Sequence, residues 1–371
     1  MSGSARQAVS CSVMWAAAGW LGIMTLPMHA AVASEAEMVI EDNDYDGPGG
    51  SNIQSIIPLL SARNVRILGF TVATGDGWEN AESAHLRRLL EIAHVTDIPV
   101  VEGAVYPLVN TPERMRVHEE QFGEIPWKGA WGGHGAVISS GVEPPVGRLP
   151  EGAPKMAVTP GTAAAFMIDM VHRYPHQVTI FEAGAMTNLA LAIRLDPTFA
   201  QTAKQLVFMG GLVDTNMSAI NGNAAYTDDF NMVFDPEAAH ITLTAPWPKI
   251  TVVGNISASL MLSKQDVAAL AEHGGPVARY MNTYYDPMPL WDEMAAAIAV
   301  DPTLIVKSQS VYMDIDTIPG INYGRAHVWT REQAPLRTGV REVNLVEQVD
   351  EKRFLHDFMH EAATLGTAPS P

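Results

Sequence analysis

The chain has 371 residues, with 41 acidic and 23 basic side chains, a formal net charge of -18 and a single cysteine. With 17% charged and 47% hydrophobic residues, its composition excludes an intrinsically disordered chain and a bundle of membrane helices. One cysteine excludes an internal disulfide, and no cluster of Cys and His is present to hold structural zinc. The surplus of negative charge argues against nucleic acid or an anionic membrane as a partner, and it leaves small neutral or cationic ligands and metal ions.

Residues 1–33 have the pattern of a cleaved signal peptide. Arg6 precedes an apolar run from Val13 to Leu26, and the small residues of Ala31-Val32-Ala33 follow as a cleavage site. The run is short for a transmembrane span, and an uncleaved anchor is the alternative interpretation. We therefore expect a periplasmic or secreted mature protein of residues 34–371, without a membrane segment. The single cysteine of the chain lies in the part that would be removed.

Beyond this segment, short apolar runs alternate with amphipathic segments. The expected strands are Met38–Glu41, Val65–Ala73, Val178–Glu182, Gln205–Met209 and Ile250–Val253. The expected helices are Ile53–Ala62, Ala81–Ala93, Thr162–Tyr174, Leu189–Leu195 and Pro236–Leu243. Apolar strands that alternate with helices predict an α/β, Rossmann-like fold with a mostly parallel open sheet and helices on both faces. In such sheets ligands bind beyond the carboxyl ends of the strands.

A long segment, residues 104–160, interrupts this alternation and is rich in Pro, Gly and Trp. Such a segment is either a cover over a binding site or a surface element that contacts another subunit, and we predict a lid over the strand ends. Trp127 and Trp131 within it would either cover a ligand or pack the lid down. Neither half of the chain is flanked by a linker, so we expect one catalytic domain, residues 34–371, with a C-terminal helix and tail at 350–371.

Acidic and amide side chains follow several of the expected strands. Asp42, Asp44 and Asp46 alternate after the first strand and could converge on a hard cation, although an ordinary acidic turn is the alternative. Similar polar segments follow at 74–77, 183–188, 209–211, 223–231 and 291–293. In the last of these, Asp292 and Glu293 also suit the first turn of a helix, so their spacing alone is not specific. The repetition predicts a site for a hydroxyl-rich ligand held by a hard cation.

The ordered set of these motifs resembles the inosine-uridine preferring nucleoside hydrolase family over nearly all of the chain from Met38. Asp42-x-Asp44 is similar to the first half of that family's aspartate cluster, and Gly184–Ala190 resembles its Gly-x-x-Thr-Asn-x-Ala segment. The other matching segments are Met209-Gly210-Gly211, Gly222-Asn223, Asp229-Phe230-Asn231, Asp235–Ala239 and Trp291-Asp292 with Asp301-Pro302. Each motif is weak alone, whereas their order is specific. The Asp-Asn-Asp opening and the Trp-Asp motif look closer to a secreted subgroup of the family.

The resemblance implies a nucleoside hydrolase-like fold and cleavage of the N-glycosidic bond of ribonucleosides to ribose and free base by metal-activated water. It implies Ca²⁺ as cofactor, a small-molecule nucleoside as substrate and a homo-oligomer. Asp44 would ligate the metal and take the proton from the attacking water. The other metal ligands would come from Asp46, Asn52, the backbone carbonyl of Thr187, and Asp292. The sugar would be held by Asp76, Asn223, Asp229 and Asn231, with Asp76 standing where the family usually has Asn and Asp229 where it usually has Glu.

The chain departs from the family at its second aspartate pair. At equal spacing that pair is replaced by Pro48 and Gly49, and with a three-residue insertion it is replaced by Ser51 and Asn52. One anionic metal ligand is then missing. Either Asp46 substitutes for it, or the metal is bound weakly or not at all.

Trp291 stands in the place of a His that some family members use in protonating the leaving group. We predict Trp291 as a catalytic residue that would stack the base while solvent or a tyrosine supplies the proton. Two other functions stay open at this stage. One is a related ribosyl or furanosyl glycosidase, and the other is a non-catalytic nucleoside- or sugar-binding protein that has lost turnover with the second aspartate pair.

Overall fold

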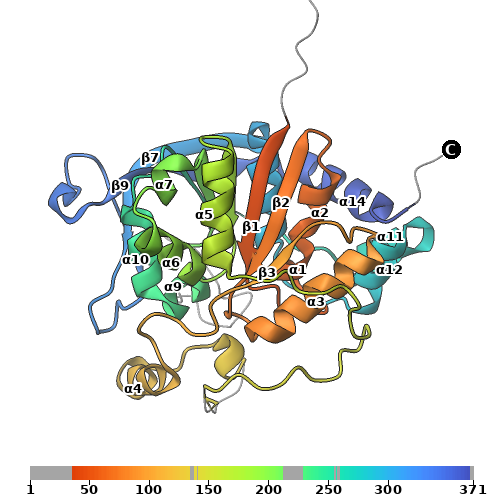
Figure 1. Cartoon of the computed structure of the whole chain (residues 1–371), viewed down its shortest axis with the longest axis horizontal. Helices are drawn as coiled ribbons and strands as arrows, with labels where there is room; N and C mark the ends of the chain where they lie inside the picture. The colour runs from red at the N-terminus through yellow and green to blue at the C-terminus, as the bar shows by residue number, and fades with distance from the viewer. Residues whose placement is uncertain are drawn as a thin grey trace, which may run out of the picture. The chain divides into compact units, whose positions relative to one another are not determined.

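The apolar runs of the sequence form a central sheet in the computed structural model, which describes residues 36–133, 138–139, 141–211, 229–254, 256 and 260–367. The strands are β1 (Glu37–Asn43), β2 (Val65–Val72), β3 (Val100–Glu102), β4 (Val178–Glu182), β5 (Gln205–Met209), β6 (Ile250–Val253), β7 (Ile305–Ile315), β8 (Ala326–Trp329) and β9 (Arg341–Val349). They form a nine-stranded sheet in the order β3-β2-β1-β4-β5-β6-β9-β7-β8 (Figure 1). Neighbouring strands are parallel from β3 to β9, whereas β7 is antiparallel to both β9 and β8. The predicted α/β fold with a mostly parallel open sheet is confirmed.

Helices cover both faces of this sheet (Figure 1). One layer contains α2 (Ile56–Ser61), α3 (Glu79–Ile92), α11 (Lys264–His273), α12 (Pro276–Thr283), α13 (Trp291–Val300) and α14 (Glu351–Thr364). The other layer contains α5 (Ala163–Arg173), α6 (Thr187–Leu195), α7 (Phe199–Thr202) and α10 (Pro236–Thr244). Two further short helices are α1 (Ser51–Gln54) and α9 (Phe230–Phe234). In chain order, α1 comes next after β1 and α9 comes after β5.

Successive residues of β1 show why the inner strands are apolar over most of their length. Val39 and Ile40 are both fully buried, but Val39 belongs to the core beneath α2 and α3, whereas Ile40 belongs to the core beneath α5 and α6. Side chains alternate between the two faces of a strand, so a strand covered on both faces is apolar on both of its sides. Each large side chain buried in this way contributes about 1.5 to 3 kcal/mol of hydrophobic stabilisation.

The predicted helix Ile53–Ala62 is two helices in the structure, α1 and α2. Pro58 has no N–H to donate to the carbonyl of Gln54, where α1 ends, so the ladder of helical hydrogen bonds is interrupted there. The strands β3, β7, β8 and β9 and the helices α11 and α12 were not among the predicted elements. The first six residues of β7 are only partly buried or exposed and include Lys307, Ser308 and Gln309, so this edge region lacks the apolar run that marked the inner strands.

In its described residues, the insertion 104–160 carries one regular helix, α4 (Pro112–Phe122), and the 3₁₀ turn η1 (Gly129–Trp131). Its backbone meets the residues that follow β2: the N–H of Thr74 donates to Ala104 O at 3.0 Å, and the N–H of Ala130 donates to Gly75 O at 2.9 Å. The segment therefore runs along the carboxyl ends of the parallel strands. Its opening and closing as a lid stays a prediction.

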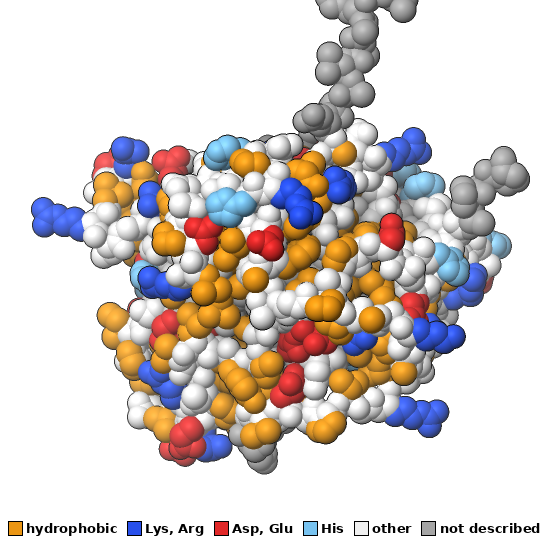
Figure 2. Space-filling model, viewed as in Figure 1, with side chains coloured by type: hydrophobic (Ala, Val, Ile, Leu, Met, Phe, Trp, Pro, Cys, Tyr) orange, Lys and Arg blue, Asp and Glu red, His pale blue; other side chains and the backbone are white. Residues whose placement is uncertain are grey.

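In the residues that the structure describes, no helix is both long and apolar enough to cross a bilayer. Figure 2 shows one face of the molecule, on which Lys and Arg side chains are scattered rather than gathered into one basic patch. The predicted signal peptide lies outside the described residues, so its cleavage stays a prediction.

Candidate active site

Asp44 lies directly beyond the carboxyl end of β1 and is completely buried. Its Oδ1 accepts a hydrogen bond from Asn52 Nδ2 at 2.7 Å, and its Oδ2 accepts one from the backbone N–H of Asp76 at 2.7 Å. Asn52 belongs to α1 and Asp76 to the loop after β2, so two neighbouring segments hold this carboxylate. A Cβ at Gly75 would overlap Asp44 Oδ2, and glycine is required there for the close approach.

Asn52 also connects Asp44 to a second carboxylate. Its Nδ2 donates to Asp76 Oδ2 at 3.1 Å in addition to Asp44 Oδ1. One amide group therefore bridges the predicted base and a predicted sugar-binding residue. As a metal ligand, Asn52 would use its other amide atom, Oδ1.

Asp292 reaches this site from late in the chain, in the first turn of α13, and is buried. Its backbone N–H donates to Ser51 Oγ at 2.9 Å, and Ser51 Oγ donates to Glu293 Oε2 at 2.5 Å. Asn43 Nδ2 lies 3.5 Å from Asp292 Oδ2 and donates to the carbonyl of Asn52 at 3.1 Å. Ser51 was expected only as one of the two residues that replace the second aspartate pair, and its connection to α13 was not predicted. The connecting role of Asn43 was not predicted either.

Another buried carboxylate, Glu82, lies in the first turn of α3. Its Oε1 accepts from the N–H of Gly77 at 2.6 Å, and Oε2 has no hydrogen-bond partner in the described part of the chain. A Cβ at Gly77 would lie 3.0 Å from Asp46 Oδ1 and 3.0 Å from Glu82 Oε1, so Asp46 and Glu82 approach each other across this glycine. Sequence reasoning missed Glu82, because an acid in the first turn of a helix is common for reasons of helix stability.

These carboxylates perturb one another. Burial raises the pKa of Asp44, and the charge of Asp76 raises it further. Burial and the charge of Asp44 raise the pKa of both Asp292 and Glu82, and burial with the charge of Asp76 raises the pKa of Asp46 to about 7. No Lys, Arg or His of the described ranges forms a salt bridge with Asp44, Asp292 or Glu82. Burial without a basic partner disfavours the ionised forms of these acids, and a bound cation would stabilise those forms.

Two predicted sugar-binding residues lie on the neighbouring strand ends. Asp229 is the N-cap of α9, where its Oδ1 accepts from the N–H of Met232 at 3.4 Å. Asn231 Nδ2 donates to the carbonyl of Ala183, just beyond β4, at 2.8 Å. Both side chains are buried, at 6% and 8% exposure. Asn223, the remaining sugar-binding candidate, lies outside the described residues.

The Thr187-Asn188 pair begins α6 at the same edge of the sheet. Thr187 Oγ1 donates to Asp235 Oδ2 at 2.8 Å, so the hydroxyl supports the start of α10, and the metal contact expected of Thr187 through its carbonyl stays a prediction. Asn188 Nδ2 donates to Asp42 Oδ1 at 2.8 Å, and Asn188 Oδ1 accepts from the N–H of Ala104 at 2.8 Å. Asp42 is thus bound to a structural amide and does not join Asp44 and Asp46 at the candidate cation site.

Trp291 stands at the first position of α13, next to Asp292, and is partly buried against the core on that side of the sheet. Its indole Nε1 is buried without a hydrogen-bond partner among the described residues. Packing against the core explains an aromatic residue at the start of α13. The stacking of Trp291 on a nucleobase stays a prediction.

The donor chemistry fits a hard cation. Asp44 and Asp292 are buried carboxylates, and the amide of Asn52 and the carbonyl of Thr187 would add neutral oxygens. Within the described part of the chain, no three His, Cys, Asp or Glu side chains are grouped closely enough to form a metal site by themselves. A cation here would therefore depend on the neutral oxygens as well as on the two aspartates.

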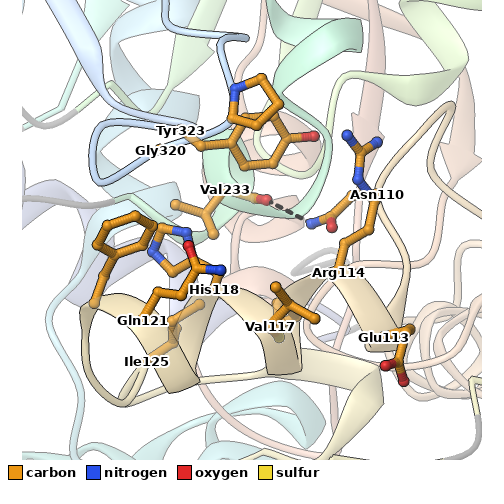
Figure 3. A pocket seen from close by; sticks show the side chains of 13 residues that line it. Asn110, Glu113, Arg114, Val117, His118, Gln121, Ile125, Val233, Gly320 and Tyr323 are labelled. Carbon is orange, nitrogen blue, oxygen red and sulfur yellow. Dashed lines mark hydrogen bonds between the residues drawn. The ribbon is translucent and has the colours of Figure 1, made fainter.

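A separate cavity of about 310 Å³ lies between α4, α9 and the loop before β8 (Figure 3). Arg114 lies over the ring of Tyr323 at 5.8 Å, and Asn110 Nδ2 donates to the carbonyl of Val233 at 3.1 Å. None of the predicted site residues that the structure describes lines this cavity. It lies between the insertion and α9 and is distinct from the acidic site.

The open sheet and the oxygen-rich site at its strand ends define an α/β enzyme. A model of the family described as inosine-uridine preferring nucleoside hydrolase matches residues 39–356, and the chain belongs to this family. It is similar to an uncharacterized protein, C800.11, of Schizosaccharomyces pombe, with 30% identity over 81% of this chain and 78% of that protein. It is also similar to probable uridine nucleosidase 2 of Arabidopsis thaliana, with 28% identity over 73% of this chain and 77% of that protein.

Among solved structures, a plant nucleoside hydrolase, the PpNRh1 enzyme, superimposes with a TM-score of 0.69 at 24% identity, over 88% of this chain and 99% of that chain. This likeness shows the nucleoside hydrolase fold. The predicted family and enzyme class are confirmed: the protein is a hydrolase of the family that acts on N-glycosyl bonds, and that family is metal-dependent. A nucleoside is accordingly its small-molecule substrate class.

Proposed function

We propose that this protein is an exported nucleoside hydrolase that splits ribonucleosides into ribose and free base with Ca²⁺-activated water. The observation that carries the proposal is the buried Asp44 carboxylate, held by Asn52 and the backbone of Asp76. Asp292, Asp76, Asp229 and Asn231 lie around the same strand ends. Export rests on the signal-peptide pattern of residues 1–33.

The chemistry follows from the positions of these residues. Asp44 would take the proton of the attacking water at one of its carboxylate oxygens, which two hydrogen bonds keep in a fixed orientation. Ca²⁺, held by Asp44, Asp292, the carbonyl of Thr187 and an oxygen of Asn52 or Asp46, would lower the pKa of a bound water and orient sugar hydroxyls.

The sugar would be oriented by Asp76, Asp229 and Asn231. Positive charge develops on the ribosyl carbon as the base departs, and the nearby carboxylates stabilise that charge more strongly in the transition state than in the bound nucleoside. Trp291 would stack on the leaving base, and solvent would supply its proton.

The experiment is a ribose-release assay on a panel of purine and pyrimidine nucleosides, with and without a calcium chelator. We expect product from at least one nucleoside and its loss on chelation, with recovery on adding Ca²⁺. Calorimetric binding of nucleosides without any product would instead identify a binding protein. Release from other ribosyl or furanosyl compounds alone would identify a related glycosidase.

Export is tested separately by expressing the full chain in a bacterial host and fractionating the cells. We expect the mature protein in the periplasm or medium, with a mass that corresponds to loss of residues 1–33. An intact N-terminus in the membrane fraction would contradict export in favour of an anchored protein.

A further inference from the structure

The side chain of Trp127, in the insertion, contacts the acidic site directly. Its indole Nε1 donates a hydrogen bond to Asp76 Oδ1. Its ring packs edge-on against Phe230, with ring centroids 6.5 Å apart and an interplanar angle of 76°. Phe230 lies between Asp229 and Asn231 in the chain. Trp127 therefore contacts the loop that carries Asp76 and the segment that carries the other sugar-binding candidates.

The backbone around Trp127 is held in place on both sides. Lys128 is completely buried, and its Nζ donates to the carbonyl of Ile125 at 2.9 Å and to Glu119 Oε1 at 3.1 Å. The N–H of Ala130 donates to Gly75 O at 2.9 Å, and a Cβ at Gly129 would overlap that same carbonyl and the ring of Phe230. This part of the insertion is thus packed directly on the loop that precedes Asp76.

The Asp76 carboxylate needs such support. It lies close enough to Asp44 for its charge to disfavour ionisation there, and the two anions repel each other. Two N–H groups oppose this repulsion, because Asn52 Nδ2 donates to Oδ2 and Trp127 Nε1 donates to Oδ1. A carboxylate oxygen can accept a second hydrogen bond, so both oxygens can still accept from a sugar hydroxyl.

We propose that Trp127 is a positioning residue, which holds the Asp76 carboxylate through its indole N–H in the orientation that binds the sugar of the substrate. The inference rests on the proposed nucleoside hydrolysis and assigns to the insertion a direct part in it. Trp131, four residues later, has a different role. It packs against Phe234 with ring centroids 4.7 Å apart, and its Nε1 has no hydrogen-bond partner among the described residues.

The two tryptophans allow a matched experiment on the full-length mature enzyme. Trp127→Phe keeps an aromatic ring and removes the N–H that Asp76 accepts, whereas Trp131→Phe removes an N–H that donates to nothing described. We expect kcat/KM of Trp127→Phe to fall about 10- to 100-fold, as for loss of a hydrogen bond to a charged group. The Trp131→Phe enzyme, assayed at a temperature where it is folded, should stay within about threefold of wild type, although its Tm falls because the ring is buried.

A double-mutant cycle with Asp76→Ala shows whether Trp127 acts through Asp76. If it does, Trp127→Phe should change kcat/KM little in the Asp76→Ala background, because the acceptor is already absent. Equal effects in both backgrounds, or an unchanged kcat/KM in the single variant, would overturn the inference. Circular dichroism and Tm of each variant identify a loss that comes only from unfolding. Absence of any nucleoside cleavage by the wild-type enzyme would refute the proposed function instead.

Discussion

Two groups of carboxylates lie close to β1 and differ in their surroundings. The strand cluster consists of Glu41, Asp42 and Glu182, which lie within β1 and β4 and are fully buried. The strand-end cluster consists of the buried Asp44, Asp292 and Glu82 and the partly buried Asp76, which lie beyond the ends of strands or in the first turns of helices. Only one residue, Asn43, separates Asp42 from Asp44 in the sequence. Residue type alone therefore does not distinguish an acid that supports the sheet from one that serves the site.

The difference lies in what surrounds each group. In both clusters burial is the main cause that raises the pKa values, and neighbouring charges add to it, as Asp42 does for Glu182 and Asp76 does for Asp44. The clusters differ in position and in partners. Within the sheet, Asp42 is bound to the amide of Asn188 at 2.8 Å. The strand-end carboxylates lie at the edge where ligands bind in such sheets, so a cation can reach them and reduce their repulsion.

The largest expected effect comes from removing the charge of the strand-end cluster at its centre. Asp44→Asn should lower kcat by on the order of a thousandfold, because the general base is lost while the side chain keeps its shape. Asp42→Asn, the matched change in the strand cluster, should leave kcat within about tenfold of wild type. Steady-state kinetics on the best nucleoside of the panel measures both. Equal losses of kcat in the two variants would mean that the strand cluster and the strand-end cluster do not differ in their contribution to catalysis.

Calcium should stabilise the protein through the strand-end cluster. A ligand that binds only the folded state at 100 times its Kd adds about 2.7 kcal/mol to the free energy of unfolding. We expect Ca²⁺ to raise Tm, a chelator to reverse the rise, and Asp292→Asn to abolish most of it. Differential scanning calorimetry with and without Ca²⁺ makes the measurement. A Ca²⁺-dependent Tm shift that survives in Asp292→Asn would exclude Asp292 as a ligand.

The strand cluster should contribute to stability instead. Asn188→Ala removes the amide that donates to Asp42 and to the carbonyl of Val72 and that accepts from Ala104. Leaving buried polar groups unpaired costs about 1 to 3 kcal/mol for each group, so we expect a loss of about 3 kcal/mol in the free energy of unfolding. Urea denaturation followed by circular dichroism tests this. A loss below about 0.5 kcal/mol would mean that water replaces the amide without cost.

The smallest effect concerns pH. Burial raises the pKa of Glu41 to about 8 in the folded protein, above its ordinary value of 4.5. Glu41 therefore contributes stability that is fully present below pH 4.5 and is lost as the pH rises through about 8. Glu41→Gln should make the free energy of unfolding fall less steeply between pH 6 and 9 than in the wild type. Denaturant titrations at several pH values, all in chelator, compare the two slopes, and identical slopes would show that Glu41 does not titrate in this range.

Much of the parallel half of the fold could be predicted because its signals are local. A strand covered on both faces is mostly apolar, as β4 and β5 are, and short polar segments follow its end. The strands β7 and β9, in the antiparallel part of the sheet, mix exposed and buried positions, and their polar residues obscure the apolar pattern. The predicted helix Ile53–Ala62 is divided into α1 and α2 because Pro58 cannot donate a helical hydrogen bond. The apolar run of this segment gives no sign of that division.

The sequence by itself determined the α/β class, the position of the polar segments at strand ends and the family, because these depend on periodicity and on the order of motifs. Tertiary structure decided which acids share one site. Asp42 and Asp44 look equivalent in sequence, but Asn188 binds the first while Asn52 and the backbone of Asp76 hold the second. Glu82 and Trp127 join the site because α3 and the insertion are packed against the loop after β2. Contacts between residues so far apart in the chain depend on packing and leave no periodic signal in the sequence.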